Sequence, residues 1–230
     1  MLNKFILYLF KKFKPDFSFD KDLSFDERVS FFLGHFLSTL RGTCVHLIKF
    51  KHFRILSLGK NVVILYKNRI RFGKNNRIGN NVFLSGLGKR GILFGNNVSI
   101  GDYSRIEFSQ TISNIGAFIK IGDNVGISSF AGLGGSGGVT IGSDCIIGQY
   151  FSCHPENHIF EDCEQLIRLQ GVSKTGIKIG NNVWIGAKVT ILDGSVVGNN
   201  CVIAAGAVVK GVFPDNCVLG GLPARILKEI

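Results

Sequence analysis

The chain has 230 residues, enough for one domain with a sizeable core, and its 45% hydrophobic content excludes an intrinsically disordered protein. The formal net charge of +11 favours anionic partners, but no RNA- or DNA-binding motif accompanies that charge, so we expect no nucleic-acid partner. The six cysteines include no Cys-x-x-Cys pair. They therefore predict no disulfide framework, and they fit a reducing compartment.

Residues 1–56 are rich in Phe, Leu and Lys and poor in glycine, which predicts a helical segment distinct from the rest. Ser24 and Glu27 form the Ser-x-x-Glu pattern of a capping box, and Gly42 stands where the helix could end. An apolar stripe at helical spacing consists of Val29, Phe32, Leu33, Phe36, Leu37 and Leu40. Most such stripes pack on their own domain, and we favour that interpretation here.

A second interpretation places the N-terminal segment on a membrane surface, as a peripheral contact helped by Lys11, Lys12 and Lys14. The apolar stretch over residues 1–13 is too short to span a bilayer and lacks a small-residue cleavage site. We therefore predict neither a signal peptide nor a membrane span from it.

From Leu58 onward a six-residue period replaces the helical one. The unit Ile179 to Trp184 is followed at once by the unit Ile185 to Thr190, and the apolar first place returns at Ile191, Val197, Ile203 and Val209. The fifth place is small or β-branched: Val183, Val189, Ser195, Cys201 and Ala207. This period fits neither an α-helix nor an alternating sheet, but it fits stacked coils of short strands joined by Gly- and Asn-containing turns.

Three parts follow from these patterns. We predict a helical segment over 1–56, a β-solenoid over 57–213 with an inserted loop over 151–176, and a short C-terminal cap over 214–230. The period restarts with apolar doublets after interruptions, as at Ile70/Phe72 and Ile177/Ile179, which indicates that loops leave the solenoid there. The literal Gly-x-Gly-x-x-Gly over 132–137 opens no helix, so we expect no dinucleotide site.

Residues 179–187, 203–209 and 220–225 resemble the hexapeptide-repeat acyltransferases. Within that family the chain is similar to the maltose and galactoside O-acetyltransferases and to the sugar O-acetyltransferases of surface-polysaccharide gene clusters. The resemblance implies an all-β, left-handed parallel β-helix, a homotrimer with active sites between subunits, and acetyl-CoA as co-substrate without a metal. It also implies a cytoplasmic enzyme of polysaccharide biosynthesis, which could lie at the inner face of the membrane.

Two histidines lie in the polar region that interrupts the repeat. In the resembling family a histidine in a His-Pro step here is the general base, which points to His154, and an Asn-His step in some relatives makes His158 the rival. An imidazole can take the proton of an acceptor hydroxyl as that hydroxyl attacks the thioester. A backbone N–H, by family alignment that of Ala187, would stabilise the oxyanion, and transfer would be direct.

The resemblance also implies the residues that hold the cofactor. Small residues would let the pantetheine arm approach the backbone, cations would meet the phosphates and the adenine end, and an outward-facing tryptophan would lie beside the substrate groove. The corresponding residues are Trp184, Ala187, Ala205, Gly206, Ala207, Lys210, Arg225 and Lys228.

Other functions remain open at this point. The acceptor could be an amine, as in an N-acyltransferase on an amino-sugar nucleotide, or it could be serine. A carbonic anhydrase-like β-helix would need a third histidine ligand for zinc, and the repeat region holds only His154 and His158. A zinc cluster of Cys153, His154, His158 and Cys163 matches no standard spacing. A non-catalytic scaffold is the remaining alternative.

Overall fold

The fold is known from a computed structural model, which describes residues 8, 18–20, 22–50, 55–108 and 114–230. Lys11, Lys12 and Lys14 lie outside the described residues, so the membrane contact inferred from them stays a prediction. No helix in the described part of the chain is long and apolar enough to cross a membrane.

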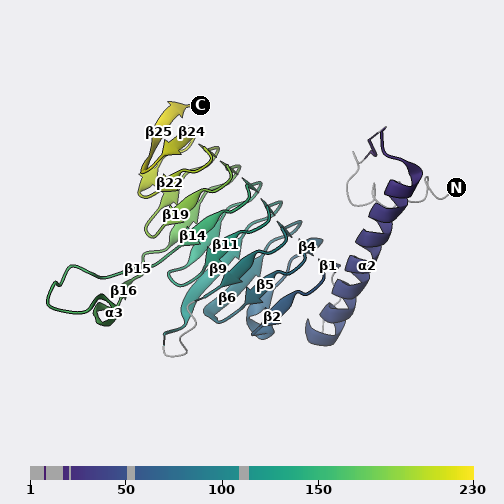
Figure 1. Cartoon of the computed structure of the whole chain (residues 1–230), viewed down its shortest axis with the longest axis horizontal. Helices are drawn as coiled ribbons and strands as arrows, with labels where there is room; N and C mark the ends of the chain where they lie inside the picture. The colour runs from purple at the N-terminus through teal and green to yellow at the C-terminus, as the bar shows by residue number, and fades with distance from the viewer. Residues whose placement is uncertain (1–7, 9–17, 21, 51–54, 109–113) are drawn as a thin grey trace.

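The main body is the predicted left-handed parallel β-helix, a column of stacked coils with three flat sides (Figure 1). Each side is a sheet whose neighbouring strands come from successive coils and run parallel, except that the last strand of one sheet folds back antiparallel. Within the described residues the sheets contain nine, seven and seven strands, and we name them sheets A, B and C.

Sheet A contains β1 (Leu56–Leu58), β4 (Asn76–Ile78), β7 (Ser99–Ile100), β10 (Gly126–Ile127), β13 (Ile146–Ile147), β18 (Trp184–Ile185), β21 (Val202–Ile203), β24 (Cys217–Gly221) and β25 (Ala224–Glu229). Sheet B contains β2 (Val63–Leu65), β5 (Phe83–Ser85), β8 (Arg105–Glu107), β11 (Gly132–Gly134), β14 (Ser152–His154), β19 (Thr190–Leu192) and β22 (Val208–Val209). Sheet C contains β3 (Ile70–Arg71), β6 (Gly88–Phe94), β9 (Gly116–Ile121), β12 (Val139–Ile141), β17 (Ile177–Ile179), β20 (Val196–Val197) and β23 (Val212–Phe213).

The core is one aliphatic column inside the coils. Its residues come from the first and fifth places of the repeat and are almost fully buried, as Ile185, Val189 and Ile191 show. Both members of the predicted doublets also point inward, because a strand that alternates over three residues directs its first and third side chains to one face. The sequence prediction of the column is therefore confirmed.

Asparagine and aspartate side chains join the turns of successive coils. At the corner between sheets C and A, Asn75, Asn97 and Asn124 each have a positive φ, and the side-chain amides of Asn97 and Asn124 each donate to the next coil. Asparagine tolerates the left-handed region, and stacking satisfies its amide, so the same residue type can serve every coil.

The N-terminal helix α2 (Phe25–Phe50) begins with the predicted capping box, because the backbone N–H of Ser24 donates to Glu27 and that of Glu27 donates to Ser24 Oγ. The expectation that Gly42 ends the helix is wrong. Gly42 instead lets the helix approach strand β1, since a Cβ there would collide with the carbonyl oxygen of Leu56.

The expectation that the apolar stripe of α2 packs on its own domain is also wrong. The helix meets the coil through Ser38, Arg41 and Gly42, with Ser38 bonded to Ser57 and Arg41 donating to the carbonyl of Leu58. The stripe lies on the opposite side of the helix by the 100° advance per residue, and most of it is exposed: Leu33, Phe36, Leu37 and Leu40.

The coil continues past the predicted boundary at residue 214. Pro214, Asp215 and Asn216 form a regular turn, and β24 adds to sheet A with Cys217 and Leu219 fully buried. Strand β25 then folds back antiparallel on β24, so the cap consists of residues 222–230.

Four of the six cysteines lie inside the column, and two are exposed. Burial raises the pKa of the Cys153 thiol to about 12, so it stays protonated and unreactive near neutral pH. Brief treatment with iodoacetamide at about pH 8 is therefore expected to modify Cys44 and Cys163, and Cys153 only after unfolding in urea. Peptide mass spectrometry measures this, and equal labelling of Cys153 and Cys163 in the native protein would contradict the buried position.

Candidate active site

Strand β14 carries His154 at its C-terminal end, on the outer face of sheet B. The strand alternates, so Cys153 is buried in the column while Ser152 and His154 face outward. The neighbouring strand β19 pairs with all three residues and places Leu192 beside His154. On its other side β14 pairs with β11 through Ser152 and Cys153, so the backbone of His154 is held at the end of a strand within the coil.

The hydroxyl of Ser152 lies 2.6 Å from Nε2 of His154. Either atom can be the donor, depending on which imidazole nitrogen carries the proton. A hydroxyl at this distance shows that Nε2 can share a hydrogen bond with an oxygen on the outer face of the sheet. Sequence reasoning missed this contact, although the spacing i, i+2 on a strand would have allowed it.

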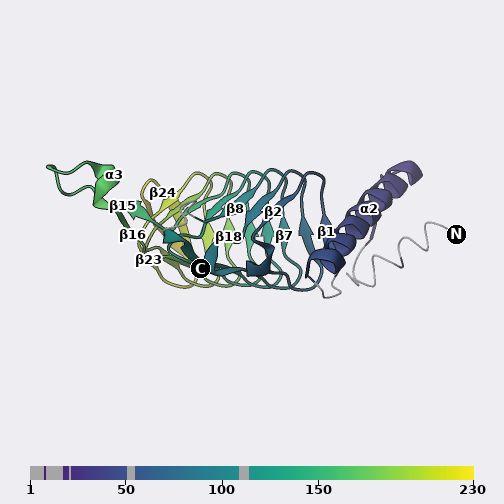
Figure 2. The same ribbon diagram turned by 90° about the horizontal axis from the view of Figure 1, so that it is seen from below.

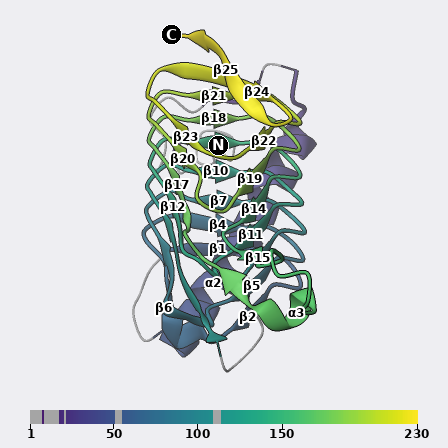
Figure 3. The ribbon, with the colours of Figure 1, turned by 90° about the vertical axis from the view of Figure 1, so that its left-hand side faces the viewer.

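The inserted loop leaves the coil after His154, not at residue 151 as the sequence suggested. Phe151 is buried in the column, and β14 belongs to sheet B. The loop protrudes from the C-terminal half of the column and contains the strands β15 (Asn157–His158) and β16 (Val172–Ser173) and the short helix α3 (Ile167–Gln170) (Figures 2 and 3).

His158 lies on the protruding hairpin, where β15 pairs antiparallel with β16 and His158 stands opposite Val172. Its side chain is exposed, and within the described residues no hydrogen bond to its imidazole is present. The backbones of the two candidate bases are therefore held by different elements: His154 lies on a strand of the coil, and His158 lies on the protruding hairpin.

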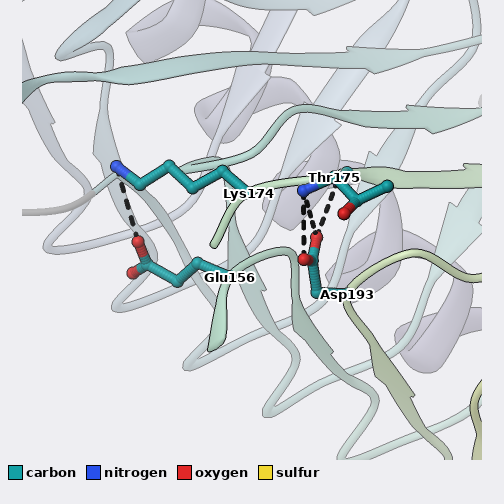
Figure 4. Close-up of polar contacts among 5 residues, drawn as sticks. Glu156, Lys174, Thr175 and Asp193 are labelled. Atoms are coloured by element: carbon teal, nitrogen blue, oxygen red, sulfur yellow. Dashed lines mark hydrogen bonds and ion pairs between the residues drawn. The ribbon is translucent and has the colours of Figure 1, made fainter. Parts of the chain in front are cut away.

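A buried carboxylate holds the loop where it returns to the coil (Figure 4). Asp193 accepts the backbone N–H of Thr175 at 3.0 Å and that of Gly176 at 2.7 Å. On the same returning arm, Lys174 Nζ lies 3.6 Å from the carboxylate of Glu156, which belongs to the outgoing arm of the loop. The Asp193-Gly194 step was readable as a turn, but its partners in the loop were not.

The predicted cofactor residues lie toward the C-terminal end of the column. Ala187, Ala205 and Gly206 are exposed at the corner between sheets A and B, and the N–H groups of Ala187 and Ala205 have no acceptor among the described residues. Lys210, Arg225 and Lys228 are exposed on the last coils. The outward direction predicted for Trp184 is confirmed.

The prediction that Ala207 lines the cofactor groove is wrong. Only 1% of its surface is exposed, because the fifth place of the unit points into the column. It packs among the core residues and cannot line an outer groove.

Within one chain, His154 and the Ala187 corner lie at opposite ends of the sheet B strands. Leu192, the neighbour of His154, follows Ala187 by five residues, of which the last three form β19. At about 3.3 Å per residue the separation is roughly 15 Å. The two groups of one chain therefore cannot reach the same reacting bond.

The described residues contain no group of three His, Cys, Asp or Glu side chains that could hold a metal ion. The zinc cluster considered from the sequence is not assembled. Cys153 is buried in the column, whereas Cys163 is exposed in the loop.

Residues 176–211 match the family described as bacterial transferase hexapeptide (six repeats). The chain is 28% identical over 167 residues to an Escherichia coli K12 protein named "Putative lipopolysaccharide biosynthesis O-acetyl transferase WbbJ", covering 70% of this chain and 71% of that one. It is 34% identical over 137 residues to the galactoside O-acetyltransferase of the same organism, covering 60% of this chain and 56% of that one.

Among solved structures, a hexapeptide-repeat acetyltransferase of Vibrio cholerae complexed with acetyl coenzyme A superposes with a TM-score of 0.50 at 28% identity. The match covers 59% of this chain and 69% of that one. Together with the three-sided column and its six-residue repeat, these matches show that the chain carries the hexapeptide repeat and is similar to acyltransferases built from it.

Proposed function

We propose that the protein transfers an acetyl group from acetyl-CoA to a hydroxyl of a sugar or glycan precursor in the synthesis of a cell-surface polysaccharide. The observation that carries the proposal is the outward-facing His154 on a rigid strand, with a hydroxyl oxygen 2.6 Å from its Nε2. An acceptor hydroxyl that approached Nε2 on this outer face would give its proton to the same nitrogen. The similarity to two enzymes named as O-acetyltransferases supports this acceptor chemistry.

The proposed reaction is direct. His154 takes the proton of the acceptor hydroxyl, the oxygen attacks the thioester carbonyl, and the bond from the carbonyl carbon to sulfur breaks to release CoA. The N–H of Ala187 would stabilise the oxyanion, since it points to no acceptor within the described chain. Lys210, Arg225 and Lys228 would bind the CoA phosphates through charge-assisted hydrogen bonds, with Trp184 beside the pantetheine arm.

This reaction needs two copies of the chain. Because His154 and Ala187 of one chain are roughly 15 Å apart, a His154 from one subunit must meet the Ala187 corner of another. A homotrimer with active sites between subunits satisfies this requirement around a closed ring. Light scattering on the purified protein measures the subunit number.

The function is tested by an acetyl-CoA-dependent thiol-release assay against mono- and oligosaccharides, amino sugars and serine. The proposal predicts release of CoA with a saccharide whose reactive group is a hydroxyl, and little release without acceptor. CoA release only with an amino sugar or with serine would show that the acceptor is not a sugar hydroxyl. No CoA release with any acceptor would favour a non-catalytic scaffold.

We place the enzyme in the cytoplasm, at the inner face of the membrane, where the exposed stripe of α2 would contact lipid. The same assay on the soluble and membrane fractions of cells that express the protein locates it. Activity confined to the soluble fraction would remove the membrane contact from the proposal.

A further inference from the structure

Three aromatic rings form a continuous stack on the outside of the column. Tyr103 and Phe130 lie with centroids 5.2 Å apart and planes 5° apart, and Phe130 and Tyr150 lie 5.0 Å and 7° apart. The three residues are 55%, 44% and 49% exposed. Since even the middle residue is nearly half exposed, the offset stack leaves aromatic surface open to solvent. We call these three residues the aromatic ladder.

The aromatic ladder occupies one corner of three successive coils, between sheets A and B. The backbone N–H of Phe130 donates to the carbonyl of Asp102, and that of Tyr150 donates to Ser129, so the turns are stacked in register. The ladder residues have φ values of 59°, 63° and 58°. Bulky side chains are rare in this left-handed region, so rings in three adjacent coils indicate a role beyond the turn itself.

Two other coils show what the turn alone requires. On the N-terminal side of the ladder, the same place is held by Asn61 and Asn81, whose side chains bond to each other. At the corner between sheets C and A, every described non-glycine residue with a positive φ is Asn or Asp. The fold is therefore satisfied by asparagine where the ladder has rings.

The ladder leads directly to the place where the proposed reaction occurs. In the coil after Tyr150 the same corner place belongs to Lys188, whose N–H donates to the carbonyl of Gln149, and Ala187 immediately precedes it. Successive coils are about 4.8 Å apart. The proposed cofactor residues lie from Ala187 toward the C-terminal end of the column, with the acetyl group at Ala187. The aromatic ladder lies on the N-terminal side of Ala187, so it begins where the acetyl group would be.

We propose that the aromatic ladder is the binding platform for a saccharide acceptor of more than one sugar unit. This inference rests on the proposed function, which brings the acetyl group to Ala187. A pyranose presents C–H groups on its faces and hydroxyls on its rim, so its faces pack on aromatic rings while its rim stays polar. The phenolic hydroxyls of Tyr103 and Tyr150 supply hydrogen-bonding groups beside the apolar surface.

The test replaces Phe130 or Tyr150 with asparagine, the residue that the fold already uses at this corner. Tyr66→Asn is the matched control, because Tyr66 is also a left-handed tyrosine, 50% exposed, but lies between β2 and β3. Maltose and maltotriose serve as probes in saturation-transfer NMR without acetyl-CoA. The best saccharide of the thiol-release assay serves for kinetics.

The aromatic ladder predicts saturation transfer to the sugar protons in the native protein and in Tyr66→Asn, and its loss in Phe130→Asn and Tyr150→Asn. The KM for the saccharide rises about tenfold in these two variants, while the KM for acetyl-CoA is unchanged. Unchanged saccharide KM in both ladder variants overturns the inference and leaves the transferase intact. A changed subunit number in light scattering also overturns it, because the ladder would then be a contact between copies.

The two proposals fail in different ways. If maltotriose binds through the ladder but no saccharide is acetylated, the transferase proposal is wrong and the binding platform stands. If saccharides are acetylated equally by the native protein and the ladder variants, the binding platform is wrong and the transferase proposal stands.

Discussion

Replacing His154 with alanine is expected to lower kcat for acetyl transfer by about two to four orders of magnitude, the usual contribution of a positioned general base. The KM for acetyl-CoA should change little, since the imidazole acts on the acceptor hydroxyl. The fold should be retained, because the side chain is exposed at the end of β14 and contributes nothing to the column. Circular dichroism and the thiol-release assay on the same sample measure both.

His158→Ala is the matched comparison, since it also removes an exposed imidazole from the same region. A general base needs a fixed position relative to the reacting atoms, and the paired strand β14 fixes His154 better than the protruding hairpin fixes His158. We therefore expect only a minor effect of His158→Ala on kcat. Abolished transfer in His158→Ala with activity kept in His154→Ala would assign the base to His158.

Ser152 makes the direct mechanism testable as well. A hydroxyl 2.6 Å from a histidine nitrogen also has the geometry of a nucleophile and its base. Direct transfer predicts an unchanged protein mass after mixing with acetyl-CoA in the absence of acceptor, and activity in Ser152→Ala. An acetyl group found on Ser152 would contradict direct transfer.

Replacing Asp193 with alanine is expected to destabilise the base of the inserted loop by about 3 kcal/mol or more. The carboxylate is buried and accepts the N–H groups of Thr175 and Gly176, and hydrogen bonds to a charged acceptor are each worth about 1.5–3 kcal/mol. Alanine would leave both N–H donors without a partner. Limited proteolysis should then cut within residues 155–176 much faster than in the native protein, and urea unfolding should report lower stability.

Two control variants separate the carboxylate from general loop effects. Asp193→Asn keeps an oxygen acceptor and should lose less stability than Asp193→Ala. Lys174→Met removes only the partly exposed ion pair with Glu156, which is worth less than about 1 kcal/mol. Equal proteolysis of Asp193→Ala and native protein would show that the loop is held by other contacts.

The column was predictable because its physical requirement repeats along the chain. Each unit must place one aliphatic side chain inside and one small residue beside it, so places such as Ile185 and Val189 are readable from spacing alone. The capping box of α2 was readable for the same reason, since both partners lie within one turn.

Features that depend on contacts between distant segments were not predictable. The direction of the α2 stripe is set by the contact of Gly42 with Leu56, and the loop base is set by Asp193 meeting Thr175. The aromatic ladder joins residues 20 and 27 positions apart in coils of unequal length, so no fixed period reveals it. For the candidate site, spacing indicated the histidines, but only the fold separates His154 from the Ala187 corner of its own chain.

The chemical nature of the product shows whether the protein transfers acetyl groups to a saccharide hydroxyl. Purified protein, acetyl-CoA and the best saccharide acceptor are incubated, and free CoA and acetylated saccharide are quantified together by mass spectrometry before and after mild alkali. Transfer to a saccharide hydroxyl predicts equal amounts of CoA and acetylated saccharide, with the acetyl group lost in alkali as expected for an ester. An alkali-stable acetyl group on nitrogen, or CoA released without any acetylated saccharide, would contradict it.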